Sequence, residues 1–254
     1  MTLPRLFCPV VSVFFFSVAD AAVVYDFETG LGAIQDLSFS GGSNYGLATS
    51  ADGTNGLSLF SHSANASTVV GLSNPLVCED LNVGDTLSLS FDLVYTNSSN
   101  TNFLNWGFAD LATGTSVSGF SSGSGGAFEF GIDGGSASFA AGTGSSTTGS
   151  STFIPDGSYF VEFSVSSLGG DQFQVSSVLT DFATSAIVQS YSGSISIPGL
   201  EGQPVHPMFG QRSGRNTRGQ SMVVDNIMTS VVPEPSGSLL KLGAAVLLLL
   251  LRRR

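Results

Sequence analysis

The stretch "DTLSLSFDLVYT", Asp85–Thr96, alternates apolar and polar residues at almost every position. Successive side chains of a β-strand point to opposite faces of the sheet, so this stretch has one apolar face and one polar face. The apolar face carries Leu87, Leu89, Phe91, Leu93 and Tyr95. Serines and Asp92 lie on the opposite face. This period of two predicts a half-buried antiparallel strand.

The same period returns in "SYFVEFSVSS", residues 158–167, and in "DQFQVSS", residues 171–177. Shorter apolar runs separated by Gly, Ser and Asn predict further strands at 23–27, 57–62, 67–72, 103–109, 127–132, 186–191, 194–197 and 222–229. Nothing between these runs has the period of a long amphipathic helix. About eleven strands of this kind predict an all-β fold, an antiparallel jelly-roll β-sandwich.

Residues 111–152 are unusually rich in Gly, Ser and Thr, as in "AAGTGSSTTGSST". One interpretation is a linker between two domains. The other is a set of long sandwich loops around strands at 127–132 and 137–140. We favour the loops, because neither half of the chain alone offers enough strands for a closed core. The sequence therefore predicts one β-sandwich domain over residues 22–231.

The chain is acidic, with 19 Asp and Glu against 8 Lys and Arg and a formal net charge of −11. Only three of the cations, Arg212, Arg215 and Arg218, lie between residues 22 and 231. A field of this sign repels phosphate backbones and argues against nucleic acid as a partner. It suits an exported protein that stays soluble or meets divalent cations.

Residues 1–21 have the order of a secretory signal peptide. One cation, Arg5, precedes an apolar core, and "ADA" at 19–21 gives an A-x-A site with cleavage expected after Ala21. Cleavage there leaves Cys78 as the one cysteine of the mature chain, so we expect no intramolecular disulfide.

The C-terminal residues 232–254 combine "VPEPS", a short apolar run and three arginines. The run is short for a full membrane span, but the terminal arginines would hold its end in the cytoplasm. All three parts, in this order, resemble the PEP-CTERM sorting signal of Gram-negative bacteria, also catalogued as the ice-binding protein C-terminal domain. The resemblance implies sorting by exosortase, with Pro233, Glu234 and Pro235 as the processing site. It also implies transient anchoring in the inner membrane by a short apolar helix, followed by placement at the cell surface or in the extracellular matrix.

The domain between these ends has a looser resemblance. "VVYDFETG" near its start and "SMVVDNIMTSVV" near its end are similar to the first and last strands of concanavalin A-like (laminin-G-like) or galactose-binding-like jelly rolls. In a jelly roll these two strands commonly lie together. Asp26, Glu28 and Asp225 could then share a Ca²⁺ ion, although a solvated polar face is the competing interpretation.

Candidate sugar contacts are few. The arginines Arg212, Arg215 and Arg218 could form an anion site for acidic sugars, since guanidinium groups pair with carboxylates, or they could form salt bridges with nearby acids. Trp106, the one tryptophan, could be a sugar platform, but its apolar neighbours favour a place in the core.

The sequence contains no closely spaced set of catalytic carboxylates, and it has only two histidines. We therefore expect a non-enzymatic, exported surface or matrix protein that associates with extracellular polysaccharide. The alternatives are a structural coat protein without a specific ligand and, third, a polysaccharide-active enzyme.

Overall fold

The computed structural model describes residues 23–32, 34–36, 45–60, 67–72, 83–96, 102–109, 124–133, 136–143, 145–148, 154–196, 205–213 and 221–232. The described residues form strands and connections, with no helix among them that could cross a membrane. The predicted signal peptide, Cys78 and the C-terminal tail lie outside these ranges.

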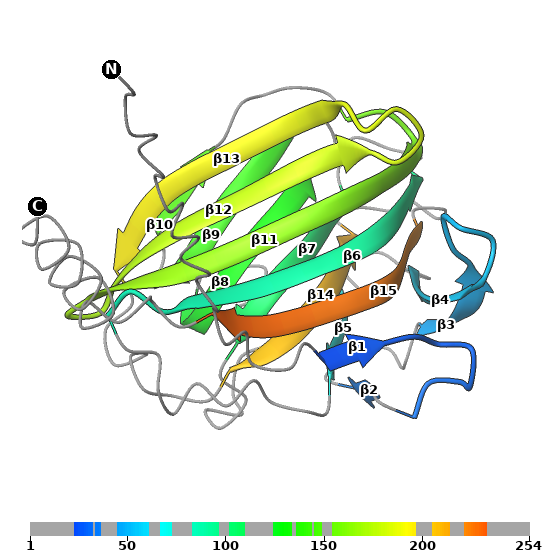
Figure 1. The fold of residues 1–254 in the computed structure, drawn as a ribbon, viewed down its shortest axis with the longest axis horizontal. Helices are drawn as coiled ribbons and strands as arrows, with labels where there is room; N and C mark the ends of the chain where they lie inside the picture. The colour runs from blue at the N-terminus through cyan, green and yellow to red at the C-terminus, as the bar shows by residue number, and fades with distance from the viewer. Residues whose placement is uncertain are drawn as a thin grey trace, which may run out of the picture.

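The strands form two antiparallel sheets packed face to face (Figure 1). The eight-stranded sheet has the order β13-β12-β11-β6-β15-β4-β3, with β1 also paired to β15. Its strands are β1 (Val23–Tyr25), β3 (Tyr45–Thr49), β4 (Asn55–Phe60), β6 (Thr86–Thr96), β11 (Gly157–Gly169), β12 (Gln172–Asp181), β13 (Ile187–Ser196) and β15 (Ser221–Val232).

The seven-stranded sheet lies behind it in Figure 1 and has the order β10-β9-β8-β7-β14-β5-β2. Its strands are β2 (Ile34–Asp36), β5 (Ser67–Leu72), β7 (Asn102–Ala109), β8 (Ser124–Asp133), β9 (Ser136–Thr143), β10 (Ser145–Thr148) and β14 (His206–Ser213). The predicted all-β jelly-roll architecture is confirmed. The Gly/Ser/Thr-rich segment supplies β8, β9 and β10, and β8 pairs with β7.

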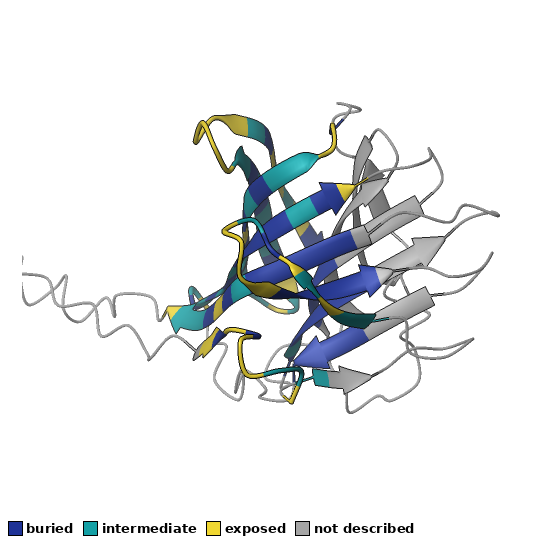
Figure 2. Ribbon diagram, turned by 90° about the vertical axis from the view of Figure 1, so that its right-hand side faces the viewer, coloured by how far each residue is buried: buried dark blue, intermediate teal, exposed yellow. Residues whose placement is uncertain are grey.

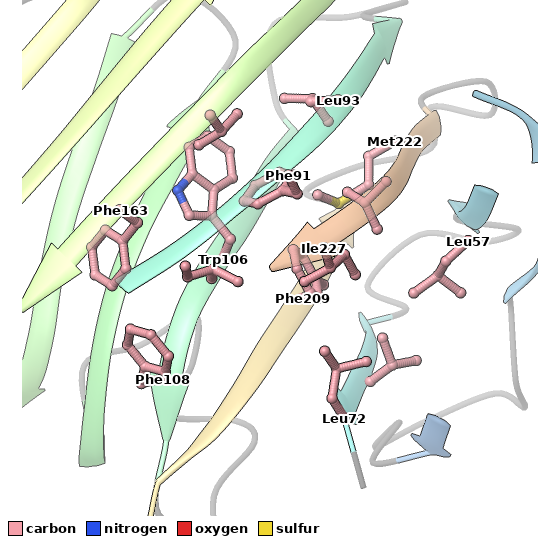
Figure 3. Close-up of a cluster of buried hydrophobic side chains, with 14 of the residues drawn as sticks. Leu57, Leu72, Phe91, Leu93, Trp106, Phe108, Phe163, Phe209, Met222 and Ile227 are labelled. Carbon is pink, nitrogen blue, oxygen red and sulfur yellow. The ribbon is translucent and has the colours of Figure 1, made fainter. Parts of the chain in front are cut away.

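Alternation along the strands separates the core from the surface, as the burial colours of Figure 2 show for the eight-stranded sheet. The apolar row of β6 is buried, and the rows of β11 and β12 lie beside it on the same face. Phe91 of β6 packs edge to face against Trp106 of β7 and Phe209 of β14 (Figure 3). The ring centroids are 5.6 Å apart in the first pair and 5.0 Å apart in the second. Aromatic contacts of this geometry join the two sheets across the core.

Candidate functional site

The first and last strands of the domain lie side by side, as the sequence predicted. Along one edge β15 pairs with β6. Along its other edge β15 pairs first with β4, up to Val224, and then with β1, from Ile227. Asp225 and Asn226 therefore occupy the break between two partner strands.

The backbone is irregular at this break. The register between β15 and β6 shifts after Asp225, and Asn226 has a φ of 49°. This left-handed conformation is one that Asn tolerates better than most residues. Asp225 is the last residue before the shift, and it lies directly opposite Asp92 of β6. Two carboxylates thus face each other across neighbouring strands, where like charges are unfavourable.

The turn between β3 and β4 adds a third carboxylate, Asp52, and two hydroxyls. Asp52 Oδ1 accepts hydrogen bonds from Ser50 Oγ at 2.6 Å and from the Thr54 backbone N–H at 3.0 Å. Thr54 Oγ1 lies 2.5 Å from Asp52 Oδ1 and 2.8 Å from Asp225 Oδ2. The Thr54 hydroxyl therefore stands between two carboxylates.

The side-chain amide of Asn226 connects two of the carboxylates. Its Nδ2 donates to Asp92 Oδ2 at 2.8 Å and to Asp52 Oδ2 at 3.1 Å. Asp52, Asp92 and Asp225, connected by Thr54 and Asn226, are called the acidic cluster below. Asp225 is 1% exposed and Asp92 is 8% exposed, whereas Asp52 is open to solvent.

The environment moves the pKa values of two of these groups in opposite directions. Hydrogen bonds from Ser50, from Thr54 and from Asn226 hold the pKa of Asp52 well below its usual range, because they stabilise the charged form. Burial raises the pKa of Asp92, and the charges of Asp52 and Asp225 raise it further against the hydrogen bond from Asn226. The exposed Asp52 therefore keeps its charge more readily than an ordinary Asp, and the buried Asp92 takes up a proton more readily.

The predicted calcium ligands Asp26 and Glu28 lie at the same strand break but on the surface. Asp26 Oδ1 accepts the backbone N–H of Glu28 at 3.1 Å, and Glu28 Oε1 accepts the backbone N–H of Asn55 at 2.6 Å. As the side chains stand in the described part of the chain, no three Asp, Glu, His or Cys residues converge closely enough to ligate one metal ion. The set of Asp26, Glu28 and Asp225 stays a prediction.

The other predicted site residues are distributed as follows. Trp106 is fully buried, so it is a core residue and not an exposed sugar platform. Arg212 lies near the end of β14, where its backbone pairs with Phe103 and Ser67. Arg215, Arg218, Ala21, Pro233, Glu234 and Pro235 lie outside the described residues.

Sequence reasoning missed Asp52, Thr54 and Asp92 as site residues. Asp52 belongs to an ordinary turn sequence, "SADGTN", and Asp92 is the one acid on the polar face of β6. The pairing of β6 with β15 and the turn that leads into β4 bring them together. The one sequence feature that could have pointed to the site is Asp92, because it is an acid on a strand face that is otherwise uncharged.

A second surface feature is the outer face of the eight-stranded sheet. The register places one serine from each of five neighbouring strands in a single row: Ser230, Ser88, Ser164, Ser176 and Ser192. The adjacent row contains Val232, Thr86, Ser166, Gln174 and Ser194. These two rows, called the hydroxyl face below, carry no charged side chain.

The side chains of the hydroxyl face are hydrogen-bonded to one another across the strands. Ser164 Oγ and Ser176 Oγ are 2.7 Å apart, as are Thr86 Oγ1 and Ser166 Oγ. Gln174 donates to Ser192 at 2.7 Å and accepts from Ser194 at 2.8 Å. Each residue of these pairs is partly or fully accessible to solvent. The face is an ordered polar surface held by cross-strand pairs.

Comparison with known proteins places the fold. No family model and no curated protein matches the chain. Among solved structures, lectin II from Ulex europaeus is similar, with a TM-score of 0.58 and 12% identity over 85% of this chain and 100% of that chain. A lectin from Bauhinia forficata, solved in complex with GalNAc, has a TM-score of 0.51 and 10% identity over 83% of this chain and 97% of that one.

A protein of unknown function from Shewanella oneidensis MR-1 has a TM-score of 0.54 and 18% identity, over 91% of this chain and 97% of that chain. At these identities the similarity establishes the fold alone, a β-sandwich of the legume-lectin kind.

Proposed function

We propose that this protein is an exported, non-catalytic surface or matrix protein that binds extracellular polysaccharide. The lectin-like β-sandwich supports a carbohydrate ligand at the level of fold. The observation that carries the proposal for this chain is the hydroxyl face, because fold similarity by itself does not assign a ligand.

The hydroxyl face has the chemistry of a surface for a neutral polymer. Hydroxyl and amide groups both donate and accept hydrogen bonds, as sugar hydroxyls do. Adjacent strands repeat the same side chains about every 4.8 Å, so a long chain meets many equivalent weak contacts. Many weak contacts along one polymer give avidity without a deep pocket.

Arg212, Arg215 and Arg218 offer a separate route to an acidic polymer. They are the three cations of the segment 22–231 in a chain of net charge −11. Guanidinium groups pair with uronic or sulfated sugars through paired hydrogen bonds. Binding through these arginines weakens as salt rises, whereas binding through uncharged hydroxyls does not.

The export and sorting of the protein belong to the same proposal. The signal peptide ending at Ala21 exports the chain, and the tail around Pro233, Glu234 and Pro235 is the substrate of an exosortase-type enzyme. The short apolar helix holds the protein transiently in the inner membrane before release to the cell surface or matrix. This location rests on the resemblance of the tail to PEP-CTERM signals.

A pull-down against polysaccharide from the producing organism tests the function at low and high salt. Ser176→Glu places a charge in the centre of the hydroxyl face, and Ala183→Glu places the same charge in the exposed turn after β12. Loss of binding in Ser176→Glu alone supports the hydroxyl face. Loss in the Arg212/Arg215/Arg218 triple alanine variant, together with salt sensitivity, supports an acidic glycan.

Two outcomes contradict the proposal. No retention at any ionic strength favours the structural coat protein, and cleavage of the polymer shows an enzyme.

A further inference from the structure

The end of the eight-stranded sheet from which the chain leads to its tail carries exposed apolar side chains. β15 ends at Val232, which is 40% exposed and pairs with Thr86 at the start of β6. Thr86 pairs in turn with Ser166, near the end of β11. Leu168, two residues further along β11, is 51% exposed, and Val83, just before β6, is 58% exposed. Val83, Leu168 and Val232 are called the apolar end below.

The backbone holds this end of the sheet in a defined shape. The Gly84 N–H donates to the Ser167 carbonyl at 2.8 Å, and the Ser167 N–H donates to the Asp85 carbonyl at 3.0 Å. Gly169 has a φ of 84°, and a Cβ at this position would lie 2.8 Å from Val83 Cγ2. Glycine therefore provides both the left-handed conformation and the space for the valine. The exposure of the apolar end is thus a property of an ordered turn.

The charges near the apolar end are negative. Asp171 lies in the β11–β12 turn, beside Leu168. The one Lys or Arg in the described ranges is Arg212, which lies on β14 of the other sheet. The chain has a net charge of −11, so this surface repels an anionic partner. A partner that covers the apolar end is therefore apolar and carries no net negative charge.

The sequence after Val232 indicates which partner of this kind lies near. Six residues, 233–238, separate Val232 from the apolar run 239–251. Six residues span at most about 20 Å. The run contains one charge, Lys241, and is followed by three arginines, a pattern typical of a segment that enters a bilayer. When the run enters a bilayer, the apolar end is therefore held within about 20 Å of the point of entry.

We propose that Val83, Leu168 and Val232 rest on the surface of a zwitterionic lipid bilayer while the tail holds the chain there. This inference rests on the anchoring by the tail in the proposed function and adds a second contact to it. Three aliphatic side chains are too few for stable membrane binding by themselves. The tail supplies the affinity, and the apolar end, brought close by the tail, sets the orientation of the domain.

This orientation has a consequence for the hydroxyl face. The β11–β12 turn and the β12–β13 turn lie at opposite ends of the strands, so the second of these turns would point away from the membrane (Figure 1). The rows of the hydroxyl face run across the strands. They would therefore lie parallel to the membrane surface, on a face that stands upright and is open to a polymer outside the cell.

Two tryptophan reporters at opposite ends of the sheet test the orientation. Leu168→Trp lies in the apolar end, and Phe182→Trp lies in the β12–β13 turn, where Phe182 is 39% exposed. The purified chain, with its tail intact, is bound to phosphatidylcholine vesicles with and without bromine on the acyl chains. The Leu168→Trp reporter should lose about half or more of its emission to bromine, because apolar groups at a bilayer surface lie about 5–10 Å inside its boundary. The Phe182→Trp reporter should keep its emission. Trp106 is fully buried and contributes the same background to both.

A charge at Val83 separates the apolar end from the tail. Val83→Asp, in the Leu168→Trp background, makes contact with lipid unfavourable, so the quenching by bromine should be lost. Co-sedimentation with the vesicles should stay at the level of the parent, because the tail is unchanged. Ile187→Asp is the matched control, since Ile187 is 68% exposed at the opposite end of the sheet, and it should keep the quenching.

Three results would overturn the proposal. If the Leu168→Trp chain co-sediments with vesicles but is not quenched, the tail anchors the chain and the apolar end does not touch lipid. If the chain does not co-sediment at all, the anchoring and the contact fail together. A blue shift of the Leu168→Trp emission before vesicles are added would show that something else covers the apolar end. The cover is the chain's own tail if the shift is independent of protein concentration, and a second copy if the shift grows with concentration.

Discussion

Replacement of Phe91 by Ala tests how the two sheets are joined. Phe91 is fully buried on β6 and packs edge to face against Trp106 and Phe209 of the opposite sheet, at 5.6 and 5.0 Å. Truncation of a buried Phe to Ala costs about 3–5 kcal/mol, through lost transfer energy and the cavity that remains. Two edge-to-face contacts place this site toward the upper end of that range. The loss is a large part of the roughly 5–15 kcal/mol that stabilises a typical domain.

Urea denaturation followed by tryptophan fluorescence measures the effect, because Trp106 lies in the same contact. An m-value of about 2–3 kcal/mol/M converts the expected loss into a midpoint shift of about 1–2 M. Phe182→Ala is the matched control, since Phe182 is 39% exposed in the turn after β12. A Phe91→Ala midpoint within about 0.3 M of the wild type would refute the inter-sheet contact as the centre of the core.

Three further predictions concern a close backbone contact, a buried phenol and the tail. Gly56→Ala should lower the free energy of unfolding, measured in urea, by about 1–3 kcal/mol. The added Cβ would lie 2.8 Å from a Val223 methyl carbon and 2.9 Å from a backbone oxygen. Gly32 has open space around it, so Gly32→Ala should leave the free energy of unfolding unchanged. Burial raises the pKa of Tyr159, and the charges of Asp181 and Asp156 add to the effect. The wild type should therefore lose stability as the pH rises above about 10, and Tyr159→Phe should lack that loss when urea midpoints are compared across pH. Deletion of residues 239–254 should release a soluble form into the medium on cell fractionation, and unchanged localisation would contradict the sorting proposal.

The strands were predictable wherever a period of two met a strong apolar face. The run Ser67–Leu72 matches β5 at both ends, and the long strands β6, β11 and β12 follow their sequence pattern. Two predicted strands, 186–191 and 194–197, are one strand, β13. The apolar pattern is interrupted at Ser192 and Gly193, but the hydrogen-bonded register with β12 continues through both residues.

Four strands gave too weak a local signal. β14 carries Pro207, Gly210, Gln211 and Arg212, residues that single-sequence reasoning assigns to a loop. Its position between β7 and β5, with Phe209 in the core, overrides that local composition. The short strands β2, β3 and β10 are likewise defined by their partners more than by their own sequences.

The acidic cluster was predictable only in part, for a related reason. Adjacency of the first and last strands follows from jelly-roll topology, and this brought Asp225 into the expected site. Asp92 enters through a register between strands 133 residues apart along the chain, and Asp52 enters through the conformation of one turn. Pairing over such separations depends on where each strand begins and where bulges fall, which a period of two does not specify.

The position of the acidic cluster in the sheet also has a structural consequence. β1 and β4 divide one edge of β15 between them, so the backbone of Asp225 and Asn226 has no strand partner there within the described pairings. The strands beyond this break, β3 and β4, are short and lie at the end of the sheet. The hydrogen bonds of Asp52 with Thr54 and Asn226, and those of Asp225 with Thr54 and of Asp92 with Asn226, connect the β3–β4 turn to the two central strands β6 and β15. Edge segments open more readily than central ones, so Asp52→Ala should expose the backbone amides of β3 and β4 to hydrogen exchange far more than those of β11 and β12. An equal loss of protection in all four strands would mean that the acidic cluster stabilises the domain as a whole and does not join its edge to its centre.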